Sequence, residues 1–252
     1  MDFDLIGISI VVVANVFAGF IGGQVGGSGM ISLPVLMFLG LSPVNAVATM
    51  KFGDVFTNFS AALQYLKKKK FRLKNGIIFG TICGIGGVVG AYITVNIDET
   101  LLRQIIIGAI LALLLFTIFK KGIGLQDMKY KFKKKHLYVI VPILFLLGIY
   151  GGAIGMSTPT FIAFFFILQR QSFTQSMAIA MFIGFLVSVG AVITFLINDA
   201  IVFMYAIPQA IASGFGAYLG SRYAMKRGNS WVKILFIVVA SVFLVKLILE
   251  TF

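Results

Sequence analysis

Long apolar runs separated by short charged loops are the feature that most restricts how this chain can fold. Of its 252 residues 60% are hydrophobic and 12% are charged, whereas soluble domains carry about 25% charged residues. Ten apolar segments can be counted, and most have the roughly 20 residues that a helix needs to cross a bilayer. They are 5–25, 28–41, 43–66, 75–97, 100–119, 137–156, 157–168, 172–197, 200–221 and 231–249. The sequence therefore predicts an all-α integral membrane protein, solvated by lipid.

The charged loops predict the orientation of these segments. If all ten cross, one face receives Arg170 and the basic stretches 67–74, 120–136 and 221–233. The opposite face then receives the acidic residues Asp2, Asp4, Asp98, Glu99, Asp199 and Glu250. Lys and Arg mark the cytoplasmic side of a membrane. We therefore expect a multi-pass protein of the cell membrane with both termini outside the cytoplasm.

The two short segments, 28–41 and 157–168, decide the number of crossings. If neither crossed, the basic stretches 67–74 and 221–233 would lie on opposite sides of the membrane, so the charges favour ten crossings. The net charge of +13 lies mostly in these loops. Such a distribution suits membrane topology and anionic lipid headgroups and does not indicate nucleic acid. The acidic start "MDFD" predicts that the first span is retained and is not a cleaved signal peptide.

Five crossings in each half predict an inverted repeat, because two similar halves would enter the membrane from opposite sides. The first repeat is 1–119, a basic cytoplasmic linker is 120–136, and the second repeat is 137–252. At a sequence offset of 129, "GFIGGQVGGS" (19–28) aligns with "GIYGGAIGMS" (148–157). At an offset of 130, Gly86 and Gly90 align with Gly216 and Gly220, and each pair is spaced for close helix packing.

The glycine-rich stretch "GFIGGQVGGSGMISLP" (19–34) predicts a break between a long helix and a short one. At such a break the first backbone N–H groups of the short helix are unpaired and carry the positive end of its dipole. Ser157 or Thr158 suits the N-cap of the second short helix, Pro159 suits its first position, and Ser28 could cap the first. Two such helix starts meeting near the midplane would form an anion site. The alternative is that the glycines only permit tight helix crossing.

One charged pair lies deep inside a predicted span. Lys51 and Asp54 share a helix face, and charge inside a membrane is costly and points to function. Lys51 could attract an anion, while Asp54 could accept a proton or compensate Lys51 in the empty site; the alternative is a structural ion pair. The second half lacks this pair, so the site is expected to be asymmetric. Asn45, Thr49 and Gln24 could add hydrogen bonds.

The stretch "GFIGGQVGGSGMISLPVLMFLGLSPVNAVATMKFGD" resembles the glycine-rich motif of the TauE/SafE sulfite exporter family, also called the 4-toluene sulfonate uptake permease family. The basic stretch 67–74 and the repeat 148–157 are similar to that family as well. In the second half Met156, Thr158 and Ala163 replace Gly27, Gly29 and Pro34. The resemblance implies secondary transport of small sulfur-containing anions such as sulfite, sulfonates or sulfoacetate, with import and export both compatible.

The sequence thus predicts a carrier that works by alternating access around a midplane site. An anion channel is the alternative, and a membrane-embedded enzyme is disfavoured because one His and one intramembrane acid offer little catalytic chemistry. We expect no cofactor and no metal. His136 lies in a basic loop, which does not favour a metal ligand, and Cys83 is expected to be a small buried hydrophobic residue. The expected substrate-binding residues are Gln24, Gly26, Gly27, Ser28, Gly29, Asn45, Thr49, Lys51, Gly155, Met156, Ser157 and Thr158, with Asp54 for coupling or charge compensation.

Single cysteines introduced into a Cys83→Ser background test the predicted orientation. An impermeant maleimide should label Asp98→Cys from outside intact cells and should leave Lys69→Cys unlabelled until the membrane is opened, because basic loops stay in the cytoplasm. Exclusive labelling of position 69 from outside would overturn the orientation.

Overall fold

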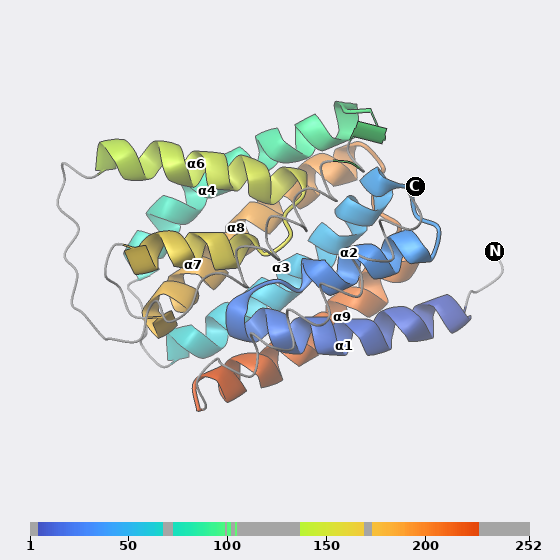
Figure 1. Cartoon of the computed structure of the whole chain (residues 1–252), viewed down its shortest axis with the longest axis horizontal. Helices are drawn as coiled ribbons and strands as arrows, with labels where there is room; N and C mark the ends of the chain where they lie inside the picture. The colour runs from blue at the N-terminus through green and yellow to red at the C-terminus, as the bar shows by residue number, and fades with distance from the viewer. Residues whose placement is uncertain are drawn as a thin grey trace.

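The computed structural model describes residues 5–67, 73–98, 100–101, 104, 137–168 and 173–226. Every secondary-structure element in this part of the chain is an α-helix (Figure 1). The helices are α1 Leu5–Val25, α2 Gly29–Phe38, α3 Pro43–Lys67, α4 Leu73–Asn96, α6 Leu137–Ala153, α7 Thr158–Leu168, α8 Phe173–Ile197 and α9 Phe203–Ala224. Their ends agree with eight predicted segments to within three residues. Most of the predicted segment 100–119, all of 231–249 and the linker 120–136 lie outside the described residues.

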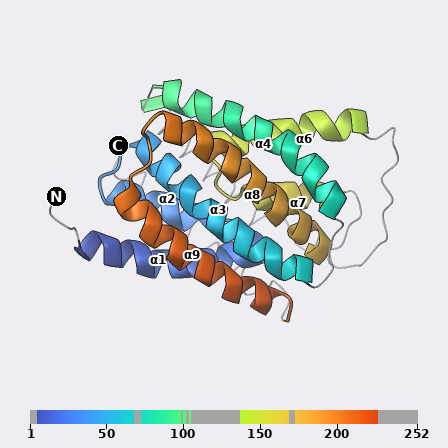
Figure 2. The same ribbon diagram turned by 180° about the vertical axis from the view of Figure 1, so that it is seen from behind.

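The chain runs back and forth along one bundle axis, as Figures 1 and 2 show from opposite sides. The ends of α3, α7 and α9 and the starts of α4, α6 and α8 lie at one end of the bundle. The described basic residues that flank these helix ends are Lys67, Lys74, Arg222 and Lys226. Asp98 and Asp199 follow α4 and α8 at the opposite end. The described charges that flank the helix ends therefore divide between the two ends as the loops predicted.

The two short helices are too short to cross a bilayer alone. Helix α2 has 10 residues and α7 has 11, which at 1.5 Å per residue is about half of a 30 Å hydrocarbon layer. Three described helical stretches are long and apolar enough to span: Leu5–Val25, Gly76–Asn96 and Gln175–Ile197. Helices α3 and α9 are as long but carry polar residues in their middles. The number of ten crossings stays a prediction.

The helix packing is duplicated in the described helices. Helix α1 packs along α9, and α6 packs along α4. The repeat offset carries α1 onto α6 and α4 onto α9, so these two interfaces are the same interface built twice. Each half therefore packs its fourth helix against the first helix of the other half. Helices α3 and α8, which also correspond, pack against each other in the centre.

Glycines let these paired helices approach backbone to backbone. A Cβ atom on Gly19 would overlap the backbone of Ser213, and one on Gly148 would overlap the backbone of Cys83, the repeat-related residue. The same close contact is made against α6 by Gly86 and Gly90 and against α1 by Gly216 and Gly220. The prediction that these spaced glycines serve close packing is confirmed. The prediction that Cys83 is a buried hydrophobe is confirmed too, and its Sγ donates to the Leu144 carbonyl.

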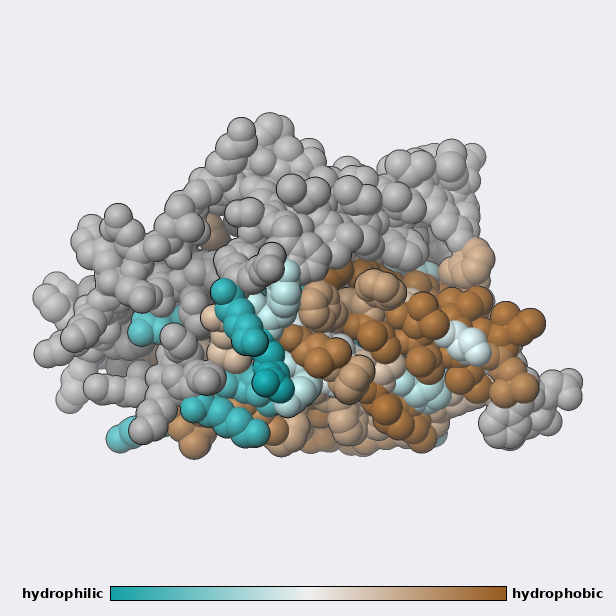
Figure 3. Space-filling view, turned by 90° about the horizontal axis from the view of Figure 1, so that it is seen from below, coloured by the Kyte–Doolittle hydropathy of each residue, from teal (hydrophilic) through white to brown (hydrophobic). Residues whose placement is uncertain are grey.

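One face of the bundle is apolar over most of its length. Figure 3 shows hydrophobic side chains covering the surface away from the hydrophilic end. On α1 and α9, large exposed hydrophobic residues include Leu5, Ile6, Val13, Phe17, Ile207, Ile211 and Phe215. An apolar surface of this extent is typical of a protein that contacts lipid.

The interior contains two separate apolar clusters. The α2 cluster comprises buried residues of α2 with Met50, Met156, Phe195, Tyr205 and their neighbours. The α7 cluster comprises Ile162, Ala163 and Phe166 of α7 with Tyr65, Phe79, Met177, Val187 and their neighbours. Along α3 the fully buried members of the α2 cluster end at Met50, and those of the α7 cluster begin at Ala61. The stretch of α3 between these points holds the buried polar residues Lys51, Asp54, Thr57 and Asn58.

The duplicated interface predicts that Gly152→Ala lowers folded yield and thermal stability. Its new methyl group would overlap the Gly87 backbone, and overpacking of this kind typically costs about 1–3 kcal/mol. Gly214→Ala is the matched control, because a Cβ there lies 3.5 Å from the Phe56 Cβ, an ordinary contact. Detergent-solubilised yield and apparent Tm would be compared, and equal losses for both variants would refute the packing role.

Candidate functional site

The candidate site is built around two breaks, one between α1 and α2 and the other between α6 and α7. Left-handed backbone occurs at Gly26 (φ +75°) and Gly27 (φ +96°) before α2, and at Gly155 (φ +67°) before α7. Glycine adopts this conformation without steric cost. The second break has Met156 where the first has Gly27, and its next left-handed residue is Ser157 (φ +58°). The two breaks therefore share a first left-handed glycine, and the second left-handed residue comes one position later in the second break than in the first.

The two breaks lie against each other. The Thr160 hydroxyl of α7 donates to the carbonyl of Val25 at the end of α1, with a distance of 2.6 Å. A Cβ on Gly26 would lie 3.0 Å from the Thr160 nitrogen, and one on Gly29 would lie 3.3 Å from the Met156 Cα. The starts of α2 and α7 are thus brought together, as the repeat predicted.

The charged pair of α3 joins the two breaks. The Lys51 ammonium lies 3.2 Å from Asp54 Oδ2 and also donates to the Gly155 carbonyl at 3.3 Å. The other carboxylate oxygen, Asp54 Oδ1, accepts from the Ser28 hydroxyl at 2.8 Å. Lys51 is 1% exposed, and Asp54 and Ser28 are buried. One helix face therefore presents an anion to the start of α2 and a cation to the break before α7.

Several hydrogen-bond donors at the breaks have no partner. Among the described residues, no hydrogen bond uses the amide N–H groups of Gly27, Ser28, Gly29, Met156 or Ser157. The Ser157 hydroxyl is also without a partner, although the residue is only 1% exposed. Buried polar groups are nearly always hydrogen-bonded. Unused donors gathered at two helix starts are suited to a small anion.

The predicted caps are wrong in detail. Ser28 lies at the N-cap position of α2, but its side chain makes no cap hydrogen bond. Its hydroxyl points to Asp54 instead, a charge-assisted bond that is stronger than a neutral one. Helix α7 begins at Thr158, so Pro159 is its second residue rather than its first. The Thr158 hydroxyl donates backwards to the Gly155 carbonyl at 3.0 Å.

Three further residues predicted for the site make no hydrogen bond to Lys51 or Asp54 in the described part of the chain. Thr49 accepts the N–H of Val202 at the start of α9, with a distance of 3.0 Å. Asn45 is only half-buried near the start of α3, about 9 Å along the helix from Lys51. Gln24 donates to the Phe20 carbonyl of its own helix at 3.1 Å. With 100° of turn per residue, Thr49 lies on nearly the opposite side of α3 from Lys51.

Other residues at the breaks were missed by the sequence analysis. The Tyr65 hydroxyl donates to the Gly23 carbonyl at 3.3 Å, and the Tyr150 hydroxyl donates to the Met156 carbonyl at 2.8 Å. A tyrosine inside an apolar span needs a partner for its hydroxyl, and this signal could have marked both residues. Asn58 and Ser188 occupy equivalent positions in α3 and α8, and their side chains meet at 3.5 Å.

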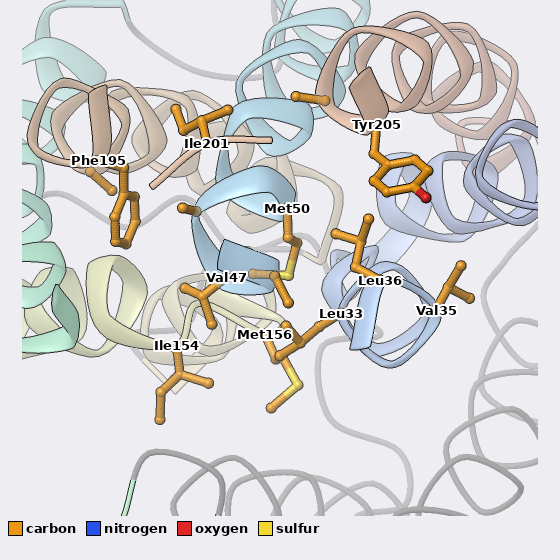
Figure 4. Close-up of a cluster of buried hydrophobic side chains, with 14 of the residues drawn as sticks. Leu33, Val35, Leu36, Val47, Met50, Ile154, Met156, Phe195, Ile201 and Tyr205 are labelled. Atoms are coloured by element: carbon orange, nitrogen blue, oxygen red, sulfur yellow. The ribbon is translucent and has the colours of Figure 1, made fainter. Parts of the chain in front are cut away.

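The site is enclosed and asymmetric. The buried polar residues around Lys51 and Asp54 form a polar layer. The α2 cluster lies on one side of this layer, and Figure 4 shows Met50, Leu33 and Met156 within the cluster. The α7 cluster lies on the other side. At the repeat offset of 130, Lys51 corresponds to Met181 and Asp54 to Gly184, so the charged pair occurs in one half, as predicted. His136 lies outside the described residues.

Sequence comparison places the chain among known proteins. A family model, sulfite exporter TauE/SafE, matches residues 11–247. The chain belongs to the TauE/SafE sulfite exporter family. The resemblance seen in the glycine-rich motif is thereby confirmed, and it covers both breaks and the charged pair of α3.

Curated relatives of the chain carry transporter names. The probable membrane transporter protein ORF9 of Sinorhizobium sp is 27% identical over 239 residues, which are 94% of this chain and 91% of that protein. The probable membrane transporter protein YfcA of Escherichia coli (strain K12) is 24% identical over 238 residues, 93% of this chain and 87% of that protein. YunE of Bacillus subtilis (strain 168), also named a probable membrane transporter protein, is 26% identical over 244 residues, 84% of this chain and 86% of that protein. No solved structure matches the chain.

The geometry predicts that removing the Lys51 charge alone destabilises the fold. Lys51→Met introduces the residue found at the equivalent position, Met181. The variant leaves a buried carboxylate without its cation, which typically lowers the free energy of unfolding by about 3–5 kcal/mol. Lys51→Met combined with Asp54→Asn should recover most of this loss, because no uncompensated charge remains. Thermal unfolding in detergent measures both variants.

Anion binding by the recovered double variant separates a binding site from a structural ion pair. If the double variant is stable and no longer binds anions, the pair serves the ligand. Wild-type anion affinity in the double variant would show that the pair is structural.

Proposed function

We propose that this protein is a secondary transporter of small sulfur-containing anions such as sulfite, sulfonates or sulfoacetate. Membership of the TauE/SafE family and the names of the relatives support a membrane transporter. The substrate class and an alternating-access mechanism are our proposal. So is the location: a multi-pass protein of the cell membrane with both termini outside the cytoplasm.

The observation that carries the proposal is the unpartnered hydroxyl of Ser157 at the start of α7. It lies two residues from Gly155, whose carbonyl accepts from Lys51. The neighbouring amides of Met156 and Ser157 also have no partner among the described residues. A sulfonate or sulfite offers several acceptor oxygens and a negative charge. Those oxygens would accept from the hydroxyl and the amides, while the charge would lie near Lys51.

The surroundings favour a small anion. The starts of α2 and α7 touch through Gly26, Gly29, Met156 and Thr160, so little space separates them. Side chains of the α2 cluster and the α7 cluster close the polar layer on both sides. A ligand with a compact tetrahedral or pyramidal head group fits this enclosure better than a long organic acid.

The two apolar clusters favour a carrier over a channel. A channel needs a continuous polar path through the membrane, whereas here an apolar cluster lies on each side of Lys51 and Asp54. In alternating access one cluster would part at a time and expose the anion to one side. Saturable uptake with counterflow would support the carrier, and uptake without saturation or counterflow would support the anion channel.

Ser157→Gly tests the location of the anion. The variant removes the unpartnered hydroxyl, and glycine readily adopts φ +58°, so the apparent Tm without ligand should not fall. Anion binding should weaken about tenfold or more, because a hydrogen bond to a charged group contributes roughly 1.5–3 kcal/mol. Thermal-shift titrations with sulfite, sulfate, thiosulfate, methanesulfonate, sulfoacetate and acetate measure both effects.

Ser176→Ala is the matched control for that variant. Ser176 has another buried hydroxyl without a partner, and it lies on α8 about 12 Å along the helix from Gly184, which faces the start of α7. The control should bind anions as the wild type does. Unchanged affinity in Ser157→Gly, or equal losses in both variants, would remove the anion from the start of α7. A wild type stabilised by none of these sulfur anions would contradict the proposed substrate class.

A further inference from the structure

We infer that binding of a monovalent anion is accompanied by uptake of one proton on Asp54. The inference rests on the proposed function, because it concerns the same anion site. It makes the protein a proton–anion cotransporter in which the empty site and the loaded site carry the same net charge.

The empty site contains a buried ion pair. Within the described part of the chain, Lys51 and Asp54 are the buried residues that carry a formal charge, and they form an ion pair of 3.2 Å. The pair is neutral as a whole. A monovalent anion entering the breaks would leave two negative charges and one positive charge in a region closed by apolar clusters. Such a net charge is strongly disfavoured where water is excluded.

The carboxylate of Asp54 lies between the start of α2 and Lys51. Asp54 accepts from the Ser28 hydroxyl at the start of α2 and from Lys51. It therefore occupies the place of an anion at one of the two helix starts, and it uses the only ammonium available to the site in the described residues. The start of α7 has unused donors but depends on the same ammonium, whose nitrogen contacts the Gly155 carbonyl. The carboxylate and a bound anion thus compete for Lys51.

The other described titratable groups around α3 do not balance the charge. Described spans of α1, α2, α7 and α8 contain no titratable side chain. The hydroxyls of Tyr65 and Tyr150 donate to carbonyls at the breaks and carry no charge to offer. The remaining titratable residues on the helices packed against α3 are Lys67 on α3 itself, Lys74, Cys83 and Tyr92 on α4, and Tyr205, Tyr218, Arg222 and Tyr223 on α9. None of these basic residues is buried beside Asp54.

Protonation of Asp54 resolves the competition. A proton from water adds to the carboxylate, and the neutral acid can keep its hydrogen bond with Ser28. Lys51 is then released to the anion, so one proton and one monoanion enter together and the net charge of the site stays zero. Release on the other side returns the proton and restores the ion pair. The apolar clusters thus never close around an uncompensated charge.

The experiment is calorimetric titration of the detergent-solubilised protein with methanesulfonate, a strong-acid monoanion that does not titrate itself. Titrations at one pH in buffers of different ionisation enthalpy count the protons taken up with the anion. Above neutral pH the wild type should take up about one proton per anion, and its Kd should rise about tenfold per pH unit. The sign follows because protons favour the bound state.

Two carboxylate variants make the assignment specific. Asp54→Asn keeps the shape of the side chain and removes its charge. It should take up close to no protons, show a Kd independent of pH, and bind more tightly than the wild type at high pH. Asp199→Asn is the matched control, because it removes an exposed carboxylate after α8, at a position where Asn tolerates φ +50°. It should behave as the wild type.

The outcomes separate this inference from the proposed function. Methanesulfonate binding without proton uptake in the wild type would overturn the inference and leave an anion transporter. Proton uptake that persists in Asp54→Asn would also overturn it, because another group would then carry the proton. A wild type that fails to bind methanesulfonate or any other sulfur anion contradicts the proposed function and the inference together.

Discussion

The buried ammonium of Lys51 is the constraint around which the middle of this protein is arranged. A charge removed from water is costly unless partners compensate it, and the partners come from three parts of the chain. Asp54 supplies the opposite charge one helical turn away, Gly155 supplies a carbonyl from the second break, and Ser28 supports the carboxylate from the first break. The ion pair therefore fixes the position of both helix starts relative to α3.

Backbone contact between duplicated helices provides the frame for this pair. Because Gly19, Gly148 and their equivalents carry no side chain, α1 meets α9 and α6 meets α4 at the distance of backbone atoms. Lipid offers little hydrophobic drive for helix association, so close packing of this kind is a main source of stability in a membrane. The same frame holds the long helices while the short helices α2 and α7 begin inside the bundle.

The two halves share their helix packing but differ in the residues that they place at the site. Met181 and Gly184 replace the charged pair in α8, and Met156 replaces the second glycine of the break. Because Met156 cannot take the left-handed conformation as easily as glycine, that conformation falls at Ser157, whose hydroxyl is unpaired. The first half thus supplies the charges, while both breaks supply unused amide donors and the second half adds the unpaired Ser157 hydroxyl. A site for one small anion requires both contributions.

Much of the fold could be predicted from the sequence, because a bilayer allows few structures. The apolar runs predicted eight helices to within three residues of their ends, and the repeated glycines predicted the duplicated close packing. Lys51 and Asp54 were predicted as part of a site because charge is rare inside membrane spans, and the two breaks because clustered glycines interrupt a helix there. Only the tertiary structure decided which donor meets which acceptor. The Ser28 hydroxyl donates to Asp54 and does not cap its own helix, and the Thr49 hydroxyl accepts from Val202 at the start of α9. These partners come from distant parts of the chain. No local sequence pattern specifies how each helix is rotated about its axis, and this rotation decides which side chains meet.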